Sequence, residues 1–520
     1  MRKGSLAAAT AALALTSLAA KVLGAVYRIP LTNLLGAEGM GLYQTFFPVY
    51  ALFITLTSGA LPAVVSRYAA YYDASGRDCG EVLAAAKKLC LAVAASGTLL
   101  FAAAAYPIAG LQAASESAAG YFILVPAVAA VAYSSVYRGW FLAKNRTSVC
   151  AAAQTAEQGI KLVFGLALAA FLAKYGSVYA VYGALAAVTL SEFAGAFILR
   201  AVYGKSKEKL PVCVDKTLFK DMARSMLPML ASALVLPIVT FVDSFAIVRL
   251  LAAYGSEETA ARQQYGLLTG AVGTLVNLPV VVALSASVAV LPKLTSELVA
   301  NGKNAAHAKT SSAVGYCLMF SLPCAIGFAL FAPEILGSLY PALSYAEIAS
   351  AAQMLRIQSA GVVFAAAMQV LCASLQALGK VRSVMVYMAV GGACRLLLQA
   401  VLMPKIGIVA APIAQCSMYA LVTVLAALGY RQETGSGVIA LNMFAKTALA
   451  GVIMIAAELG VTALGASPAV KLAVAVAVGA VTFFGTLFAV KAIVPKRRGV
   501  SAKYPEDGKN GRGEKNVQRN

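Results

Sequence analysis

Apolar segments long enough to cross a lipid bilayer recur along almost the whole chain. A membrane-spanning helix needs about 20 apolar residues, because it rises ~1.5 Å per residue across a hydrocarbon core ~30 Å thick. Segments of this kind lie at 6–27, 43–67, 88–110, 119–142, 149–173, 177–200, 225–250, 266–291, 311–338, 353–378, 384–403, 407–429, 444–465 and 471–494. Since every backbone polar group must be paired inside lipid, runs of this length are typical of helices. The sequence therefore predicts an all-α polytopic membrane protein with about 14 transmembrane helices.

The distribution of charge agrees with a membrane protein. Of the 520 residues, 61% are hydrophobic and only 12% are charged, whereas soluble proteins average about 25% charged residues. The net charge of +21 would suggest a nucleic-acid partner in a soluble protein. Here most basic residues lie in short loops and in the C-terminal tail, which is typical of segments that face anionic lipid in the cytoplasm. We therefore expect membrane lipids, and not nucleic acid, as partners.

Counting Lys and Arg on the two sides of the membrane predicts the orientation. With the N-terminus in the cytoplasm, 32 of the 42 basic residues fall on the inner side and seven on the outer side. The first twenty residues could also pass for a cleaved signal peptide, but the apolar stretch continues through Val22–Val26 to a spanning length. We interpret this stretch as the first helix and expect a multi-pass protein with both termini in the cytoplasm.

The chain also contains an approximate internal repeat. The first segment ends at Arg28 and the second begins with GLYQ at Gly41, while the seventh ends near Arg249 and the eighth begins with QYGLL at Gln264. Because six helices separate the repeats, both halves would have the same orientation; a chance match of Gly and Pro is the alternative. The repeat predicts two pseudo-symmetric six-helix lobes. Their expected bounds, with the segments around them, are 1–203 for the first lobe, 204–224 for a cytoplasmic loop, 225–430 for the second lobe, 431–494 for helices 13 and 14, and 495–520 for a basic cytoplasmic tail.

Five cationic side chains lie within or at the rims of the apolar segments. They are Lys21, Arg28, Lys161, Arg249 and Arg395. A charge at the centre of a spanning helix costs ~2.5–3.5 kcal/mol, so a set of five indicates a water-filled cavity for an anionic substrate. Lys21 and Arg28 are seven residues apart, which places them on one helix face about 10 Å apart. The alternative for Arg28 is that it reaches the outer interface.

Acidic residues inside the segments are candidates for coupling transport to H⁺ or Na⁺. They are Glu157, Asp243, Glu192 and Glu458. Glu157 and Lys161 are spaced to pair on one helix face, so the alternative for both is a structural ion pair. Asp243 and Arg249 are six residues apart on different faces, so each needs a partner elsewhere. The sequence has no cluster with metal-ligand spacing, no paired cysteine spacing and no Walker motif, so we expect no metal, no cofactor beyond the coupling ion, and no catalytic residues.

Several sequence runs identify a family resemblance. The runs are KVLGAVYRIPLTNLLGAEGMGLYQ at 21–44, PVYALFITLTSGALPAVVSRYAAYY at 48–72, YRGWFLAKNRTSVCAAAQTAEQGIKL at 137–162, FVDSFAIVRLL at 241–251, YGLLTGAVGTLVNLPVVVALSASVAVLPKL at 265–294 and LQALGK at 375–380. The chain resembles the stage V sporulation protein B group of the polysaccharide-exporter branch of the multidrug/oligosaccharidyl-lipid/polysaccharide (MOP) flippase superfamily. The likeness extends from Lys21 to about Tyr430, and segments thirteen and fourteen match in hydropathy only.

The resemblance implies a non-enzymatic flippase of the bacterial cytoplasmic membrane. Its expected substrate is an undecaprenyl-diphosphate-linked sugar of the lipid II kind, held in a central cationic cavity, with helices 13 and 14 forming a groove for the lipid tail. By position, Lys21 matches an arginine on the first helix of lipid II flippases, and Arg28 is one residue out of step with a second. The helix-two and helix-eight arginines have no counterpart here, since 54–56 and 267–269 are uncharged.

The sequence thus predicts a flippase that moves a lipid-linked cell-wall precursor by alternating access. Two alternatives remain open: an H⁺- or Na⁺-coupled multidrug exporter of the same superfamily, and a non-transporting scaffold of a cell-wall synthesis complex. Expected partners are the polyprenyl-diphosphate-linked sugar and membrane lipids, and the resemblance leaves cell-wall synthesis proteins open as further partners.

Overall fold

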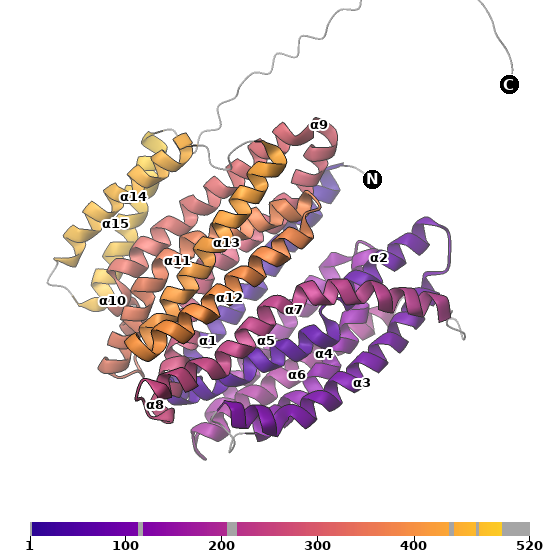
Figure 1. Cartoon of the computed structure of the whole chain (residues 1–520), viewed down its shortest axis with the longest axis horizontal. Helices are drawn as coiled ribbons and strands as arrows, with labels where there is room; N and C mark the ends of the chain where they lie inside the picture. Colours follow the sequence, from indigo (N-terminus) through magenta and orange to yellow (C-terminus); the bar gives the residue numbers. More distant parts are fainter. Residues whose placement is uncertain (1–2, 113–117, 205–215, 436–440, 464–466, 491–520) are drawn as a thin grey trace, which may run out of the picture.

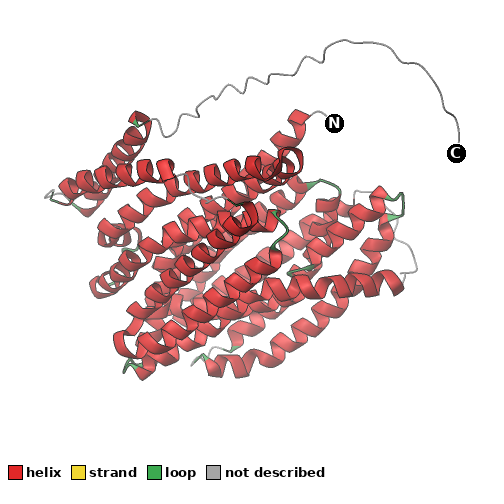
Figure 2. Cartoon of the chain, turned by 45° about the horizontal axis from the view of Figure 1, so that its top comes forward, coloured by secondary structure: helices red, strands yellow, loops and turns green. Residues whose placement is uncertain are grey.

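The computed structural model describes residues 3–112, 118–204, 216–435, 441–463 and 467–490. Within these ranges, the side chains of 3–18, 20–21, 284–309 and 441–442 lie outside the description. The described residues form helices joined by short turns, with no strand among them (Figure 2). The expected all-α class is confirmed. Residues 205–215 of the expected loop at 204–224, and the whole of the expected tail at 495–520, fall outside the described residues.

The N-terminal half of the chain contributes six helices. They are α1 (Lys3–Ser58), α2 (Leu61–Ala74), α3 (Cys79–Leu111), α4 (Ala119–Ala143), α5 (Thr147–Ala173) and α6 (Ser177–Gly204). The first two expected segments are joined in α1, which bends at Gly36, where φ is 67° and ψ is −175°. Glycine adopts this positive φ readily because it has no Cβ. The second expected segment breaks before α2, whose first turn holds Pro62, a residue without a backbone N–H.

The C-terminal half of the chain contributes the remaining elements. They are α7 (Lys216–Ala253), α8 (Glu258–Gly266), the π-helix η2 (Leu267–Val272), α9 (Gly273–Leu330), α10 (Ala332–Leu339), α11 (Tyr345–Ala377), α12 (Val381–Ile406), the 3₁₀ turn η3 (Gly407–Val409), α13 (Ala410–Thr434), α14 (Leu441–Thr462) and α15 (Pro468–Ala489). Residues 216–224, expected in a loop, are already helical and belong to α7. Leu218, Met222 and Met226 bury their side chains against the N-terminal half, and this packing extends α7.

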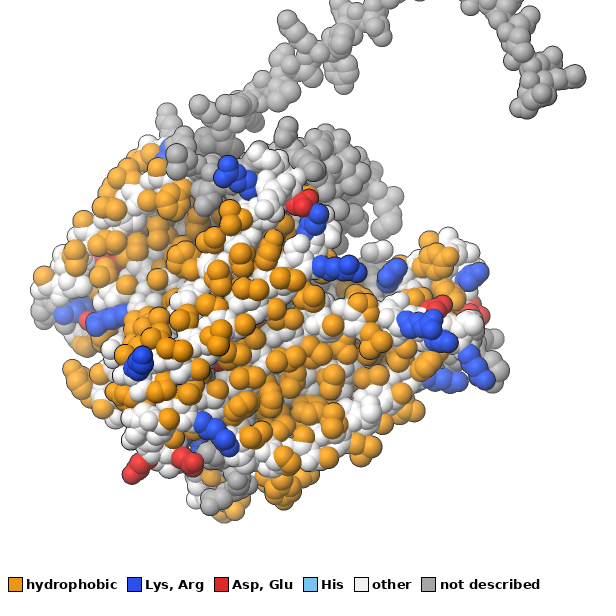
Figure 3. Space-filling model, viewed as in Figure 1, with side chains coloured by type: hydrophobic (Ala, Val, Ile, Leu, Met, Phe, Trp, Pro, Cys, Tyr) orange, Lys and Arg blue, Asp and Glu red, His pale blue; other side chains and the backbone are white. Residues whose placement is uncertain are grey.

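Twelve helical stretches among the described residues are long and apolar enough to cross a membrane. The stretch 381–434 contains two of the expected segments, and 22–74 contains the second expected segment with the end of the first. The polytopic class is therefore confirmed, while the number of fourteen separate transmembrane helices stays a prediction. Figure 3 shows apolar side chains over the broad middle of the visible face and most of the Lys and Arg side chains toward its edges, as expected for a surface that faces lipid.

The helices form two groups, with α14 and α15 on the flank of the second. Figure 1 shows α2–α6 on one side and α11–α13 on the other, with α1 and α7 running between the groups. The two groups meet near α8 and spread apart toward the end where the N-terminus lies (Figure 1). α1 packs on α5 of the first group and also on α8 and α9, so it joins the halves.

Candidate functional site

A polar cavity of about 440 Å³ lies where the two halves meet, and we call it the central cavity. Its walls come from α1, α7, the α8–α9 path, α11, α12 and α13. The polar side chains that line it are Arg28, Gln44, Thr240, Asp243, Tyr265, Thr269, Asn277, Gln358, Arg395, Gln415 and Tyr419. Amide and hydroxyl groups of this kind donate and accept hydrogen bonds in the same way as a sugar, and the two guanidinium groups suit phosphate.

Two of the five predicted cations, Arg28 and Arg395, face this cavity from opposite halves. Arg28 lies on α1 and is half-buried, eight residues before the bend at Gly36. Arg395 lies on α12, where its side chain is 15% exposed. The structure therefore brings together one cation from the first expected segment and one from the eleventh.

Arg395 is held by an acidic residue in the same wall. Its Nη2 atom lies 2.5 Å from Oδ2 of Asp243 on α7, and the Asp243 side chain is 5% exposed. The prediction that Asp243 needs a partner on another helix is confirmed, and the partner is Arg395. An ion pair that borders a cavity can exchange one partner for a ligand, because both charged groups remain within reach of the space.

Lys161 lies behind one wall of the cavity. Its Nζ atom is 5.1 Å from the ring centroid of Phe47, which lines the cavity, and 5.6 Å from that of Tyr27. A cation over aromatic faces is stabilised by the ring quadrupoles, more so when water is excluded. The alternative in which Lys161 pairs with Glu157 is not what the structure has, because Lys161 points toward α1 and Glu157 toward α4.

The partner of Glu157 is Arg138 on α4, with Nη2 and Oε1 2.5 Å apart. Sequence reasoning missed Arg138 because it assigned this residue to the cytoplasmic side. The sequence signal that could have predicted this pair was a basic residue at the end of one apolar segment and an acidic residue inside the next. A Cβ at Gly195 of α6 would lie 1.8 Å from Oε1 of Glu157, so this glycine leaves room for the carboxylate.

Glu192 on α6 completes a group that we call the N-terminal charge cluster: Arg138, Glu157, Lys161 and Glu192. Glu192 interacts electrostatically with the other three members. The cluster balances two acids with two bases and lies within the N-terminal half, outside the central cavity. No group of three or more His, Cys, Asp or Glu residues that could hold a metal ion occurs in the described part of the chain.

The other predicted site residues lie elsewhere. Arg249 is exposed, and its Nε donates to the carbonyl of Leu111, the last residue of α3, at 3.0 Å. A base beside a helix C-terminus is favourable because it pairs with unsatisfied carbonyls. Lys21 lies in α1, and its side chain falls outside the description. Glu458 lines a different pocket beside α14 and α15.

At the α8 end, the two halves are in close contact. A Cβ on Gly266 would lie 2.4 Å from the backbone nitrogen of Gly41, and one on Gly41 would lie 2.2 Å from the carbonyl oxygen of Arg262. Nearby, the Gln44 amide donates to the carbonyl of Thr269 in the π-helix η2 at 3.0 Å. Only glycine allows backbones to approach this closely. The GLYQ and QYGLL runs, which the repeat paired, therefore touch each other across the interface.

Comparison with known proteins places these features in a family. The polysaccharide biosynthesis protein family matches residues 6–297, which is more than half of the chain. The chain is 26% identical to stage V sporulation protein B of Bacillus subtilis (strain 168) over 358 residues, covering 65% of this chain and 68% of that protein. It is 22% identical to lipid II flippase MurJ of the same organism over 345 residues, covering 62% of this chain and 63% of that protein.

Solved structures share the fold across nearly the whole chain. Lipid II flippase MurJ in an inward closed conformation superposes with a TM-score of 0.73 at 13% identity, covering 93% of this chain and 99% of that structure. An inward-facing multidrug resistance MATE family transporter of the MOP superfamily gives a TM-score of 0.69 at 16% identity, covering 81% and 98%. Where the names of these proteins state an activity, it is transport or flipping, which confirms the expectation of a transport protein rather than an enzyme. The chain belongs to the polysaccharide biosynthesis protein family and has the fold of the MOP transporters, as its sequence runs predicted.

Proposed function

We propose that this protein flips an undecaprenyl-diphosphate-linked oligosaccharide of the lipid II kind across the bacterial cytoplasmic membrane by alternating access. The observation that carries the proposal is the central cavity, in which Arg28 and Arg395 face one space from the two halves. Guanidinium groups bind phosphate through paired, charge-assisted hydrogen bonds. The amide-rich walls supply the further donors and acceptors that a sugar needs.

The size of the cavity limits which part of the substrate enters it. Ligand pockets of ~300–1,000 Å³ hold drug-sized molecules, so a cavity of about 440 Å³ suits the diphosphate and the first sugar of a head group. The polyprenyl chain stays in the lipid core throughout, so none of its apolar surface has to enter water. Arrival of the diphosphate lets Arg395 exchange Asp243 for phosphate, and Asp243 is then free to take a proton or Na⁺.

The close contact of Gly41 with Gly266 is the outer gate in this proposal. The orientation with both termini in the cytoplasm then makes the conformation one that is closed on the outer side. Alternating access requires the two halves to separate at this contact and to meet at the other end. Close backbone packing suits a gate, since it excludes water when shut and involves few long side chains that must reorder.

The energy source in this proposal is electrical, with ion coupling as a second contribution. An inside-negative potential favours outward movement of an anion by about 2.3 kcal/mol per charge per 100 mV. Asp243 and Glu157 are the candidate coupling sites within the two halves, and Glu192 lies beside Glu157. Both pairs are buried, so protonation or Na⁺ binding would change their ion pairing directly.

A multidrug exporter coupled to H⁺ or Na⁺ is the second candidate function. Two observations favour it: the fold match to an inward-facing MATE transporter and the acidic Asp243 in the cavity wall. Asp243 is already neutralised by Arg395, and Arg28 adds a further positive charge. Because the charges in its wall sum to a net positive charge, the cavity repels an organic cation unless Arg395 moves away.

The test is flipping of fluorescent lipid II in proteoliposomes, with and without an imposed inside-negative potential. We expect flipping to rise with the potential and to fall at least tenfold in Arg28→Gln and Arg395→Gln. Arg356→Gln, which changes an exposed arginine on α11, is the matched control. Export of ethidium instead of lipid II would favour the multidrug exporter, and absence of any transport by a folded protein would favour a scaffold of a cell-wall synthesis complex.

A further inference from the structure

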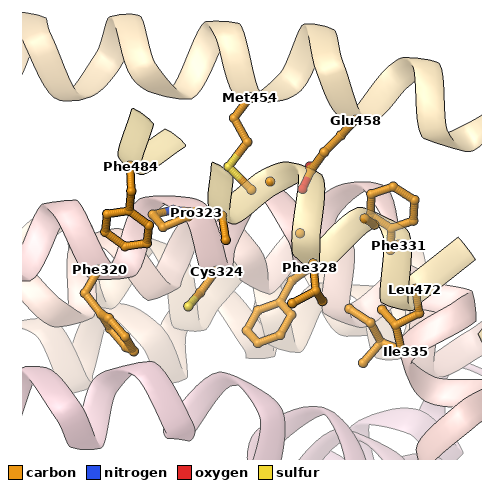
Figure 4. Close-up of a pocket in the computed structure, with 15 residues that line it drawn as sticks. Phe320, Pro323, Cys324, Phe328, Phe331, Ile335, Met454, Glu458, Leu472 and Phe484 are labelled. Carbon is orange, nitrogen blue, oxygen red and sulfur yellow. The ribbon is translucent and has the colours of Figure 1, made fainter. Parts of the chain in front are cut away.

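A second pocket, of about 270 Å³, lies between the end of α9, α10, and the helix pair α14–α15. It shares no lining residue with the central cavity. Its walls are apolar and rich in aromatic rings, among them Phe320, Phe328, Phe331 and Phe484 (Figure 4). We call it the α14–α15 pocket. Its composition suits a hydrocarbon chain, because burying apolar surface is worth about 0.8 kcal/mol per CH₂.

One acidic side chain, that of Glu458, points into this otherwise apolar pocket. Glu458 of α14 is 2% exposed, and its Oε2 atom has no hydrogen-bond partner. Figure 4 shows the carboxyl group directed into the pocket beside Met454. Glu458 is the only acidic or basic residue among the described residues that line the pocket.

The neighbouring helix is shaped to receive this carboxyl group. A Cβ on Gly479 of α15 would lie 2.5 Å from Oε1 of Glu458 and 2.8 Å from Cε of Met454. Any larger residue at 479 would displace the carboxyl group. The glycine therefore keeps Glu458 in the pocket and does not serve a tight turn, since it lies in the middle of a regular helix.

An unpaired carboxylate buried in apolar surroundings costs several kcal/mol unless a donor or cation meets it. No described basic side chain forms an ion pair with Glu458. Either a proton neutralises the carboxyl group, or a donor or cation from outside the described chain meets it. A polyprenyl tail carries no donor and would leave Oε2 without a hydrogen-bond partner, whereas a ligand with a cationic head would pair with the carboxylate.

The position of Glu458 along α14 indicates how deep in the membrane a group that pairs with its carboxylate would lie. Glu458 lies four positions before Thr462, the last residue of α14, which corresponds to about 6 Å along the axis. With α14 spanning the bilayer, as its length and hydropathy predict, the carboxyl group would lie close to the membrane interface, where lipid head groups begin. Phe320 and Phe484 lie at the opposite end of the pocket from Phe331 and Leu472, with Glu458 on the latter side (Figure 4). A ligand could place its head at Glu458 and its chain along these rings.

We propose that the α14–α15 pocket binds a molecule that has an alkyl chain ending in an ammonium group, with the ammonium on Glu458. An amine-bearing membrane lipid and a free lipophilic amine share this chemistry. The pocket shares no lining residue with the central cavity, so the ammonium site stands whether or not the proposed function holds.

Cys324 provides a reporter, because it lines the same pocket (Figure 4). The experiment measures maleimide modification of Cys324 by mass spectrometry, on the full chain in dodecyl maltoside at neutral pH. Dodecylamine, dodecanol and dodecanoic acid are compared as added ligands, since they share one chain and differ in head-group charge. Cys150 on α5, outside the pocket, is the internal reference. We expect dodecylamine to protect Cys324 at a concentration at least tenfold lower than the other two, with Cys150 unaffected.

Two variants make the test specific for the carboxyl group. Glu458→Gln keeps the shape and removes the charge, so dodecylamine should lose its advantage over dodecanol. Gly479→Ala keeps the charge and displaces the carboxyl group, so it should reduce the advantage even if Glu458→Gln fails to fold. Equal protection by dodecylamine and dodecanoic acid, or an unchanged preference in Glu458→Gln, would overturn the proposal.

A second arm identifies the source of the amine. The protein is placed in nanodiscs of phosphatidylglycerol with added phosphatidylethanolamine or, in equal amount, phosphatidylcholine. Protection of Cys324 by phosphatidylethanolamine alone supports a membrane lipid as the natural ligand. Protection by dodecylamine but by neither phospholipid supports a free lipophilic amine. Loss of all protection in the bilayer would overturn the site.

Discussion

At the scale of single residues, the ion pairs decide where charge can be tolerated inside the protein. Asp243 and Arg395 meet in the wall of the central cavity, and Glu157 and Arg138 meet within the N-terminal half. Breaking a buried pair by removing one partner costs ~3–5 kcal/mol, because the other charge is left unpaired. Removing both partners restores neutrality. Comparing single with double variants of a pair therefore shows whether its charges serve only stability or also transport.

Arg395→Gln should lower the apparent melting temperature of the solubilised protein, because Asp243 then lies buried without a partner. Asp243→Asn/Arg395→Gln should recover most of that loss, while flipping of lipid II stays at least tenfold reduced. The measurements are thermal unfolding in detergent and flipping in proteoliposomes at equal protein content. Full recovery of flipping in the double variant would show that Arg395 only neutralises Asp243.

Gly195→Ala should destabilise the protein, because the added methyl group would lie 1.8 Å from Oε1 of Glu157 and would force the Arg138–Glu157 pair apart. Gly159→Ala is the matched control on α5, where a Cβ would meet nothing within 4 Å. Alanine favours helix over glycine by about 1 kcal/mol, so the control should be neutral or stabilising. Thermal unfolding checks both variants, and an equal effect of the two would contradict the tight packing around Glu157.

At the scale of elements, α1 and α8 hold the two halves together. Their backbones come close at two glycines. Gly41 and Gly266 face each other there, and the Gln44 amide bonds to the π-helix η2 beside them. π-helical turns often occur at functional positions, since they leave backbone groups available. The same short stretch lines the central cavity, and it is the outer gate in the proposed cycle.

Gly266→Ala should loosen the outer gate, because its Cβ would lie 2.4 Å from the Gly41 nitrogen and the helices must separate. In a Thr269→Cys background, a membrane-impermeant maleimide added outside should then react several-fold faster. Gly337→Ala on α10 is the control, since a Cβ there would meet nothing within 4 Å. Unchanged labelling of Thr269→Cys in the Gly266→Ala variant would mean that this contact does not close the cavity.

At the scale of the whole molecule, the orientation of the protein in the membrane decides which side the structure is open to. The halves meet near α8 and spread toward the end that holds the N-terminus (Figure 1). If that end is cytoplasmic, as the positive-inside count predicts, the conformation is closed on the outer side. The opposite orientation would make the same shape outward-open, so topology is the first property to establish.

Cysteines introduced at Gly255 and Ser467, both exposed, should react with an impermeant maleimide added to intact cells. A cysteine at Ser75, exposed in the turn between α2 and α3, should react only after the cells are opened. The reason is that Ser75 lies among the basic loops assigned to the cytoplasm. Labelling of Ser75→Cys in intact cells would reverse the orientation and the direction of the proposed transport cycle.

Hydropathy in the sequence was sufficient to predict the all-α polytopic class, because the transfer of a residue into lipid depends mainly on that residue and its close neighbours. The same reasoning identified Arg28, Asp243 and Arg395 as charges that need a cavity or a partner. The helix bounds were less predictable. The bend at Gly36 and the start of α7 at Lys216 depend on how these helices pack against the rest of the protein.

Only the tertiary structure decided which charges meet. Glu157 is closer in sequence to Lys161 than to Arg138, yet it pairs with Arg138, since the rotation of α5 against α4 sets the direction of each side chain. Arg249 turns to the carbonyl of Leu111, and Glu458 meets an apolar pocket beside Gly479. Sequence spacing fixes only which residues share a face of one helix. Pairing between helices depends on their rotation and depth, and those follow from packing over the whole molecule.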